Sequence, residues 1–137
     1  MRGLSAAGFV PVLHGDFVPC PDGSVRVLSS DHIVFVLTKA LSPRRVIFLT
    51  DVDGVFRSEG SGEMPALLER LSAANASEMR AEASDGDDVS GGMGKKVDHA
   101  LDVAHYCEEC LIANGRRAGV LRDILAGRDV RCTRVEA

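Results

Sequence analysis

Apolar residues in this chain fall into two patterns, short runs and longer stretches with helical spacing. Short runs bounded by turn residues predict β-strands, and apolar positions three or four residues apart predict helices. Strands are expected over residues 9–13, 25–28, 46–50, 110–113 and 130–135. Helices are expected over residues 31–41, 64–71, 92–109 and 119–125. The polar stretches 57–62 and 77–88 are expected to be loops, the second exposed and mobile.

Strands that alternate with helices predict an α/β fold with a mainly parallel sheet. The run Val46–Thr50 is apolar almost throughout, as expected of a strand that is covered on both faces. In such folds ligands bind beyond the carboxyl ends of the strands. Polar turns follow three of the predicted strands and should meet at one rim, namely residues 14–16, 51–54 and 114–115.

The composition is that of an ordinary globular protein, with 45% hydrophobic and 26% charged residues in a chain of 137. We therefore expect residues 1–137 to form one domain. A net charge of −4 without a basic tract gives no argument for nucleic acid or for a membrane surface. No apolar run approaches the roughly 20 residues of a membrane span, and no signal-peptide pattern opens the chain. These features predict a cytoplasmic protein.

Two of the four cysteines, Cys107 and Cys110, form a CxxC motif. A zinc site would normally need a second pair of ligands, and only His105 stands nearby. Reduced thiols in a cytosolic protein are therefore favoured over a metal or redox site. We expect no residue of this chain to be a dedicated metal ligand.

Glycines and lysines gather in the segment 90–97, where the helix over 92–109 should begin. Glycine lets backbone N–H groups approach a phosphate closely, and a helix N-terminus adds partial positive charge. A lysine in the first turn can reach the phosphates as a point charge. The spacing is not that of a Walker A loop. On spacing alone, a glycine-rich loop with solvated lysines is equally favoured.

Acidic residues stand at two further ends of predicted elements. Asp51 and Asp53 follow the strand over 46–50, where carboxylates can hold Mg²⁺ together with substrate phosphates or can order lysines. Asp53 and Gly54 equally form a tight-turn signature, which is the favoured interpretation of this motif alone. Asp31 begins a helix, where a carboxylate is favourable against the helix dipole without any further role.

Taken in order, these segments resemble the amino acid kinase superfamily, and within it the isopentenyl phosphate kinases. The specific motifs are Thr50–Phe56 and the segment 91–96, which read TDVDGVF and GGMGKK. The turn of His14, Gly15 and Asp16 points towards the isopentenyl phosphate branch and is less specific. The match in order and spacing runs from Gly8 to the last residue.

The resemblance implies an αβα sandwich whose C-terminal lobe binds ATP and works with Mg²⁺. It implies transfer of the ATP γ-phosphate to isopentenyl phosphate, a small-molecule acceptor, to give isopentenyl diphosphate for isoprenoid biosynthesis. Lys96 would contact the ATP phosphates and Asp31 would organise the active-site lysines. The acceptor phosphate would lie near His14, Gly15 and Asp16. The remaining nucleotide-binding residues would be Asp51, Val52, Asp53, Gly54, Phe56, Gly91, Gly92 and Met93.

The chain departs from the family pattern at several points. Ser29-Ser30-Asp31-His32 stands where the family has Ser-Gly-Asp-Asp, and Phe56 replaces the usual tyrosine. The family's opening strand, its glycine-rich phosphate loop and its acceptor lobe have no counterpart before Gly8, so the N-terminal half is expected to be missing. We therefore expect an exposed apolar sheet edge and little or no phosphate transfer by this chain alone.

Two alternative functions stay open on these residues. One is another superfamily kinase, acting on glutamate, N-acetylglutamate or a nucleoside monophosphate. The other is a non-catalytic nucleotide-binding module, which the expected absence of the N-terminal half makes a serious alternative. Family members are often dimers, so the resemblance also allows a homodimer.

Overall fold

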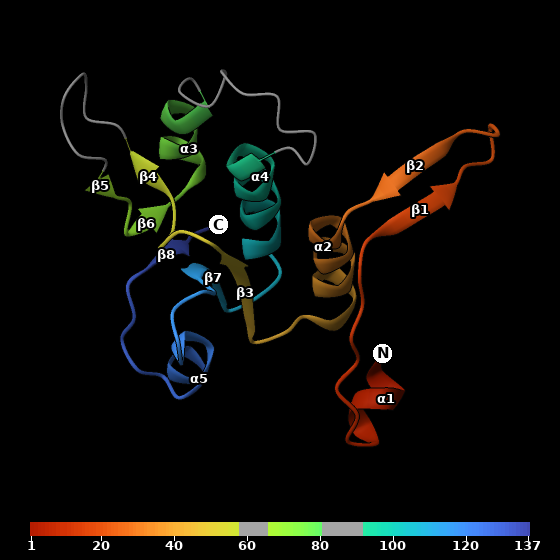
Figure 1. The fold of residues 1–137 in the computed structure, drawn as a ribbon, viewed down its shortest axis with the longest axis horizontal. Coiled ribbons are helices and arrows are strands. Elements are labelled where there is room, and N and C mark those ends of the chain that lie inside the picture. Colours follow the sequence, from red (N-terminus) through yellow and green to blue (C-terminus); the bar gives the residue numbers. More distant parts are fainter. Residues whose placement is uncertain (58–65, 81–91) are drawn as a thin grey trace.

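A computed structural model describes residues 1–57, 66–80 and 92–137. Its central sheet has four strands in the order β3-β7-β8-β6 (Figure 1). β3 pairs in parallel with β7, and β6 pairs in parallel with β8, whereas β8 runs antiparallel to β7. These strands are β3 (Arg45–Thr50), β6 (Arg70–Leu71), β7 (Glu109–Asn114) and β8 (Cys132–Val135).

The antiparallel β8 has a simple physical origin. The helix that connects β7 to β8, α5 (Val120–Leu125), has six residues and is therefore about 9 Å long. The six residues of β7 extend over about 20 Å, so this helix does not carry the chain back to the start of β7. β8 instead begins beside the carboxyl end of β7, where Cys132 is the partner of Ala113. The expected mainly parallel sheet is thus mixed, with two of its three pairings parallel.

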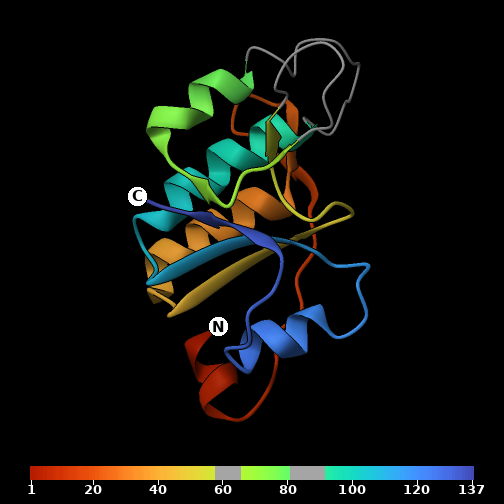
Figure 2. The same cartoon turned by 90° about the vertical axis from the view of Figure 1, so that its left-hand side faces the viewer.

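Helices cover both faces of the sheet, which gives the αβα sandwich (Figure 2). On one face lie α2 (Ser30–Leu41), α3 (Ala73–Arg80) and α4 (Gly92–Ala104), and α5 covers part of the other. The larger core lies under α4, where Val97, Ala100 and Val103 are almost completely buried. The smaller core lies between α5 and the residues Leu111, Ala113 and Cys132. The α/β fold class predicted from the sequence is confirmed.

Local signals explain where the two long helices begin and end. Ser29 caps α2, since its hydroxyl accepts a hydrogen bond from the amide of His32 at 3.1 Å. α4 stops at Ala104, earlier than the expected residue 109. Glu109 pairs with Arg45 as the first residue of β7, and this pairing takes residues 105–108 out of the helix.

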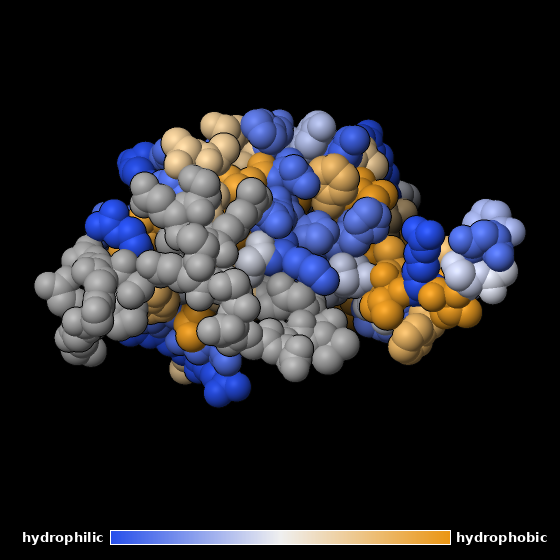
Figure 3. All heavy atoms as spheres, turned by 90° about the horizontal axis from the view of Figure 1, so that it is seen from above, coloured by the Kyte–Doolittle hydropathy of each residue, from blue (hydrophilic) through white to orange (hydrophobic). Residues whose placement is uncertain are grey.

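The N-terminal segment differs from the expectation. Residues 9–13 do not form a strand, because no neighbouring strand among the described residues offers them backbone partners. The first strand is instead β1 (Asp16–Pro19), which forms an antiparallel hairpin with β2 (Val25–Leu28). A short helix, α1 (Arg2–Ala6), precedes them and was not expected. Figure 3 shows apolar atoms gathered over this hairpin at one end of the molecule.

The helix expected over 64–71 is wrong in its described part. Residues 66–71 form the short strands β5 (Ala66–Leu67) and β6, and β5 pairs with β4 (Phe56–Arg57). The reason is long-range pairing, because Leu71 is completely buried opposite Val135 of β8. The loop expected over 77–88 is also wrong for residues 77–80, which belong to α3, and its remainder lies outside the described residues. Of the loop expected over 57–62, only Arg57 is described, and it ends β4.

The four cysteines are free thiols, as expected. Burial raises the pKa of Cys107 and Cys132, and it raises the pKa of Cys110 to about 12. Within the described residues, no group of three or more His, Cys, Asp or Glu side chains is arranged to hold a metal ion. No helix in that part of the chain is long and apolar enough to cross a membrane.

Glu109 connects three strands through ionic contacts. Its carboxylate pairs with Arg45 of β3 and, at 2.6 Å, with Arg134 of β8. Arg45 also donates to the carbonyl of Ile124 at the end of α5. Burial has the largest single effect on the pKa of Glu109 and raises it. The hydrogen bonds and charges of Arg45 and Arg134 together outweigh burial, so the pKa of Glu109 lies below its ordinary value.

We predict that Glu109→Gln lowers the free energy of unfolding by about 1–2 kcal/mol at neutral pH, because two charged hydrogen bonds are weakened. Since the folded-state pKa is lowered, this contribution is present above the ordinary pKa of 4.5 and is lost as the pH falls through the folded value. Urea unfolding at neutral and acidic pH measures both effects. The control Glu108→Gln, in an exposed pair with Arg44, should change stability by less than about 0.5 kcal/mol. An equal loss in both variants would contradict the assignment.

Candidate functional site

A cleft of about 750 Å³ lies at the carboxyl end of β3. Its wall is built from the end of β3, the loop after β2, and the first turns of α2 and α4. The sequence pattern places three polar turns at this rim, and Gly15, Asp51 and Val52 of these turns line the cleft, whereas Asn114 and Gly115 do not. The lining residues are Gly15, Val27, Leu28, Ser29, Ser30, Asp31, Thr50, Asp51, Val52, Met93, Lys95, Lys96 and His99.

An ion pair between two helices stands in this cleft. The Nζ atom of Lys96 on α4 lies 3.1 Å from Oδ2 and 3.2 Å from Oδ1 of Asp31 on α2. About a quarter of each side chain is exposed, 22% for Lys96 and 26% for Asp31. The ammonium also lies 5.6 Å from the centre of the Phe48 ring, within the range of a cation–π contact. Lys96 is therefore held on two sides while it still faces solvent.

The two helices meet the cleft with their N-termini. Ser30 and Asp31 belong to the first turn of α2, and Met93 and Lys95 belong to the first turn of α4. Each helix has at least 12 residues, so the first backbone N–H groups of each have no carbonyl partner within the helix, and this end carries a partial positive charge. Two such termini beside two lysines suit an anion with several oxygens.

Of the turn formed by His14, Gly15 and Asp16, only Gly15 lines the cleft. A Cβ atom on Gly15 would lie 2.7 Å from the carbonyl oxygen of Leu28, so this close approach requires glycine. His14 is exposed, and its Nδ1 donates to the carbonyl of Gly15 at 2.7 Å. Asp16 accepts a hydrogen bond from the amide of Phe17 at the start of β1.

The two acidic residues after β3 differ in their surroundings. Asp51 and Val52 line the cleft. Asp53 is turned away from it and accepts a hydrogen bond from Asn114 Nδ2 at 3.0 Å. It also lies 3.7 Å from Arg117 and 3.4 Å from Arg131. Asp53 therefore ties the end of β3 to the end of β7 and to the segment before β8.

Thr133 of β8 holds the next part of this turn. Its hydroxyl accepts from the amide of Val55 at 2.9 Å and donates to the carbonyl of Leu68 at 2.7 Å. A Cβ atom on Gly54 would lie 2.4 Å from this hydroxyl oxygen, so only glycine fits here. Phe56 follows in β4, where it pairs with Leu67 and does not line the cleft.

The glycine-rich segment is described only in part. Gly91 lies outside the described residues, Gly92 is the first residue of α4, and Met93 lines the cleft. His99 also lines the cleft and was not expected from the sequence motifs. It lies one helical turn after Lys95, and its Nδ1 donates to the carbonyl of Lys95. Helical spacing from Lys95 could have found it.

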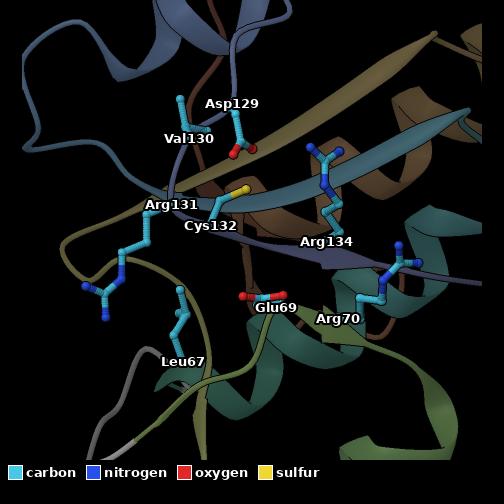
Figure 4. A pocket seen from close by; sticks show the side chains of 8 residues that line it. All are labelled: Leu67, Glu69, Arg70, Asp129, Val130, Arg131, Cys132 and Arg134. Carbon is cyan, nitrogen blue, oxygen red and sulfur yellow. The ribbon is translucent and has the colours of Figure 1, made fainter.

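A second cavity, of about 400 Å³, lies between β6 and the segment before β8 (Figure 4). Three arginines line it, and each is paired with a carboxylate: Arg70 with Glu136, Arg131 with Asp53, and Arg134 with Glu109. It also contains the acidic residue Glu69. Each of these arginines is engaged by a carboxylate, and no helix N-terminus among the described residues lines this cavity, so the larger cleft is the better anion site.

Comparison with known proteins identifies the family of this fold. Residues 1–114 match the amino acid kinase family over well more than half of the chain. The chain belongs to the amino acid kinase family. The αβα layers are those of the amino acid kinase fold, since a solved structure of that fold superposes on the chain.

The chain is similar to isopentenyl phosphate kinases and to acetylglutamate kinases. Isopentenyl phosphate kinase of Methanothermobacter thermautotrophicus is 34% identical over 140 positions, which cover 98% of this chain and 52% of the relative. Acetylglutamate kinase of Solibacter usitatus is 33% identical over 131 positions, which cover 93% and 46%. A crystal structure of isopentenyl phosphate kinase superposes with a TM-score of 0.74 at 30% identity, covering 98% of this chain and 49% of that one. The chain thus spans about half the length of the curated relatives it matches.

We predict that Thr133→Val destabilises the protein by about 1–3 kcal/mol, because the buried amide of Val55 and the carbonyl of Leu68 both lose their partner. Thr133→Ser keeps the hydroxyl and should lose about 1 kcal/mol, for one methyl group. Thermal or urea unfolding of both variants measures the difference. If valine were tolerated as well as serine, the hydroxyl would not hold the turn.

Proposed function

We propose that this chain forms the ATP-binding part of a phosphotransferase that acts on isopentenyl phosphate. The observation that carries the proposal is the Lys96–Asp31 pair, which stands in a cleft between two helix N-termini. Family membership supports the same chemistry, since the named relatives are kinases. The four free thiols fit our proposal of a cytosolic protein.

In the proposed reaction the terminal phosphoryl group of ATP passes to the phosphate of the acceptor, giving ADP and a diphosphate. Such a transfer needs positioning and electrostatic stabilisation more than covalent catalysis. Lys96 would stabilise negative charge on the moving group, and Asp31 would keep its ammonium in place. Lys95 and the amides at the start of α2 and α4 would bind further phosphate oxygens.

Mg²⁺ usually accompanies ATP and is held by one or two carboxylates together with phosphate oxygens. Asp51 lines the cleft and is mostly exposed, so it offers one such carboxylate. Asp31 is engaged by Lys96, and Asp53 is turned towards Asn114 and two arginines. These residues fit an ion that arrives with the nucleotide and is held mainly by its phosphates.

The acceptor is the least constrained part of this proposal. Isopentenyl phosphate is favoured because the turn of His14, Gly15 and Asp16 matches that branch and because the isopentenyl phosphate kinases reach 34–37% identity. Acetylglutamate kinases at 30–33% identity keep a carboxylate acceptor as the alternative. A panel of acceptors that also contains glutamate and a nucleoside monophosphate separates these kinases.

We predict that Lys96→Ala weakens ATP binding about tenfold, or roughly 1.4 kcal/mol, because a point charge beside the phosphates is removed. Isothermal titration calorimetry with ATP and Mg²⁺ measures this directly. Lys39→Ala is the matched control, since it makes the same charge change in the last turn of α2 and should leave affinity unchanged. Equal affinities for Lys96→Ala and the unaltered chain would contradict the placement of the phosphates.

We also predict that the 137-residue chain transfers phosphate poorly or not at all, because it spans only about half the length of its isopentenyl phosphate kinase relatives. A coupled ADP-release assay with isopentenyl phosphate measures the turnover. Rapid turnover by the purified chain would show this expectation to be wrong. ATP binding without turnover, also in the presence of a complementary lobe, would instead favour a non-catalytic nucleotide-binding module.

A further inference from the structure

β3 forms one end of the central sheet. Within the described part of the chain it pairs only with β7, so the backbone groups on its other edge are available to a further strand. Val46 and Phe48 point to the face covered by α2 and α4 and are buried. On the opposite face Leu49 is 43% exposed, because α5 covers residues of β7 and β8.

The N-terminal segment presents a second apolar surface. Between Phe9 and Leu13, four large hydrophobic side chains are at least half exposed, and Val10 and Val12 reach 87% and 89%. These residues belong to no described helix or strand. The amide of Phe9 donates to the carbonyl of Leu4 at 3.0 Å, but the exposed side chains have no core to cover them.

The β1–β2 hairpin adds to this surface. Phe17, Val25 and Val27 are each at least 65% exposed, and the hairpin extends away from the sheet (Figures 1 and 3). An isolated two-stranded hairpin is marginally stable in water and normally requires another element to pack on. We use the term open apolar face for three features, namely the free edge of β3, the exposed apolar side chains of segment 9–13 and those of the hairpin.

The comparisons indicate what covers this face. The matches to two isopentenyl phosphate kinases cover 98% of this chain but only 52% and 49% of those proteins. About half of each of these relatives therefore has no counterpart in these 137 residues. We propose that the open apolar face binds the polypeptide that forms this other half of the amino acid kinase fold. The contact would include a strand added to the free edge of β3, with apolar side chains on both of its faces.

This inference does not depend on the proposed phosphotransfer. It concerns an association that needs neither ATP nor Lys96. The occupant is recognised by unpaired backbone groups and apolar side chains, which is the chemistry that β3, Val10 and Val12 offer. A second copy of this chain is the competing occupant. The stoichiometry of the purified complex distinguishes a homodimer from a complex with the other half of the fold.

The test uses co-expression of the tagged 137-residue chain with the part of Methanothermobacter thermautotrophicus isopentenyl phosphate kinase that the match does not cover. We expect the two to co-purify as a one-to-one complex, measured by light scattering after size-exclusion chromatography. Val12→Lys and Leu49→Lys should each weaken the complex about tenfold or more, because each buries a charge in an apolar contact. Leu125→Lys on α5, at 65% exposure, is the control and should have no effect.

Absence of a complex would overturn the inference, and so would a homodimer of the 137-residue chain that Val12→Lys dissociates. Hydrogen exchange of the chain alone is a second measurement. Some β3 amides point towards β7 and the others point towards the free edge of the strand. Protection of the amides on the free edge would show that this edge is already paired and would contradict the inference. Lys96→Ala should retain the complex. Loss of association with intact ATP binding would therefore refute only this inference, and loss of ATP binding within an intact complex would refute only the proposed function.

Discussion

The parallel pairing of β3 with β7 is the constraint on which the rest of the structure depends. It aligns Thr50 with Asn114, so the polar turns that follow both strands come to lie at one edge of the sheet. Asn114 can then hold Asp53, which directs this carboxylate away from the cleft and leaves Asp51 facing it. The same pairing places Arg45 opposite Glu109 at the other end of both strands. One register thus determines both the site and its structural anchor.

The cleft illustrates how a charged site can be stable without a ligand. Lys96 and Asp31 neutralise one another, so neither side chain is buried as an isolated charge. In the proposed function, Lys96 would share its ammonium between Asp31 and the phosphates, and Lys95 and the first amides of α2 and α4 would add further donors. These donors would be in place before a phosphate enters, which would limit the reorganisation needed on binding.

Sequence reasoning succeeded where the signal was local. Strong helical spacing predicted α2 and α4, and a continuous apolar run predicted β3 within one residue of its start. It failed where pairing is long-range: residues 66–71 became strands because Leu71 is buried opposite Val135, and no local pattern encodes that partner. The segment 9–13 has strand-like composition but no strand beside it. The contact of Asp31 with Lys96 was expected only from the family resemblance, and the arginines around Asp53 carry no spacing signal at all.

The hydroxyl of Thr133 has a consequence for the order of folding. It satisfies an amide that precedes it by 78 residues in the sequence, and closing so long a loop carries a large entropic cost that local contacts do not repay. The hydrogen bonding of the turn after β3 is therefore complete only when β8 is in place. A chain cut before Cys132 would leave the amide of Val55 and the carbonyl of Leu68 without this partner, so the shape of this turn depends on a strand at the far end of the sequence.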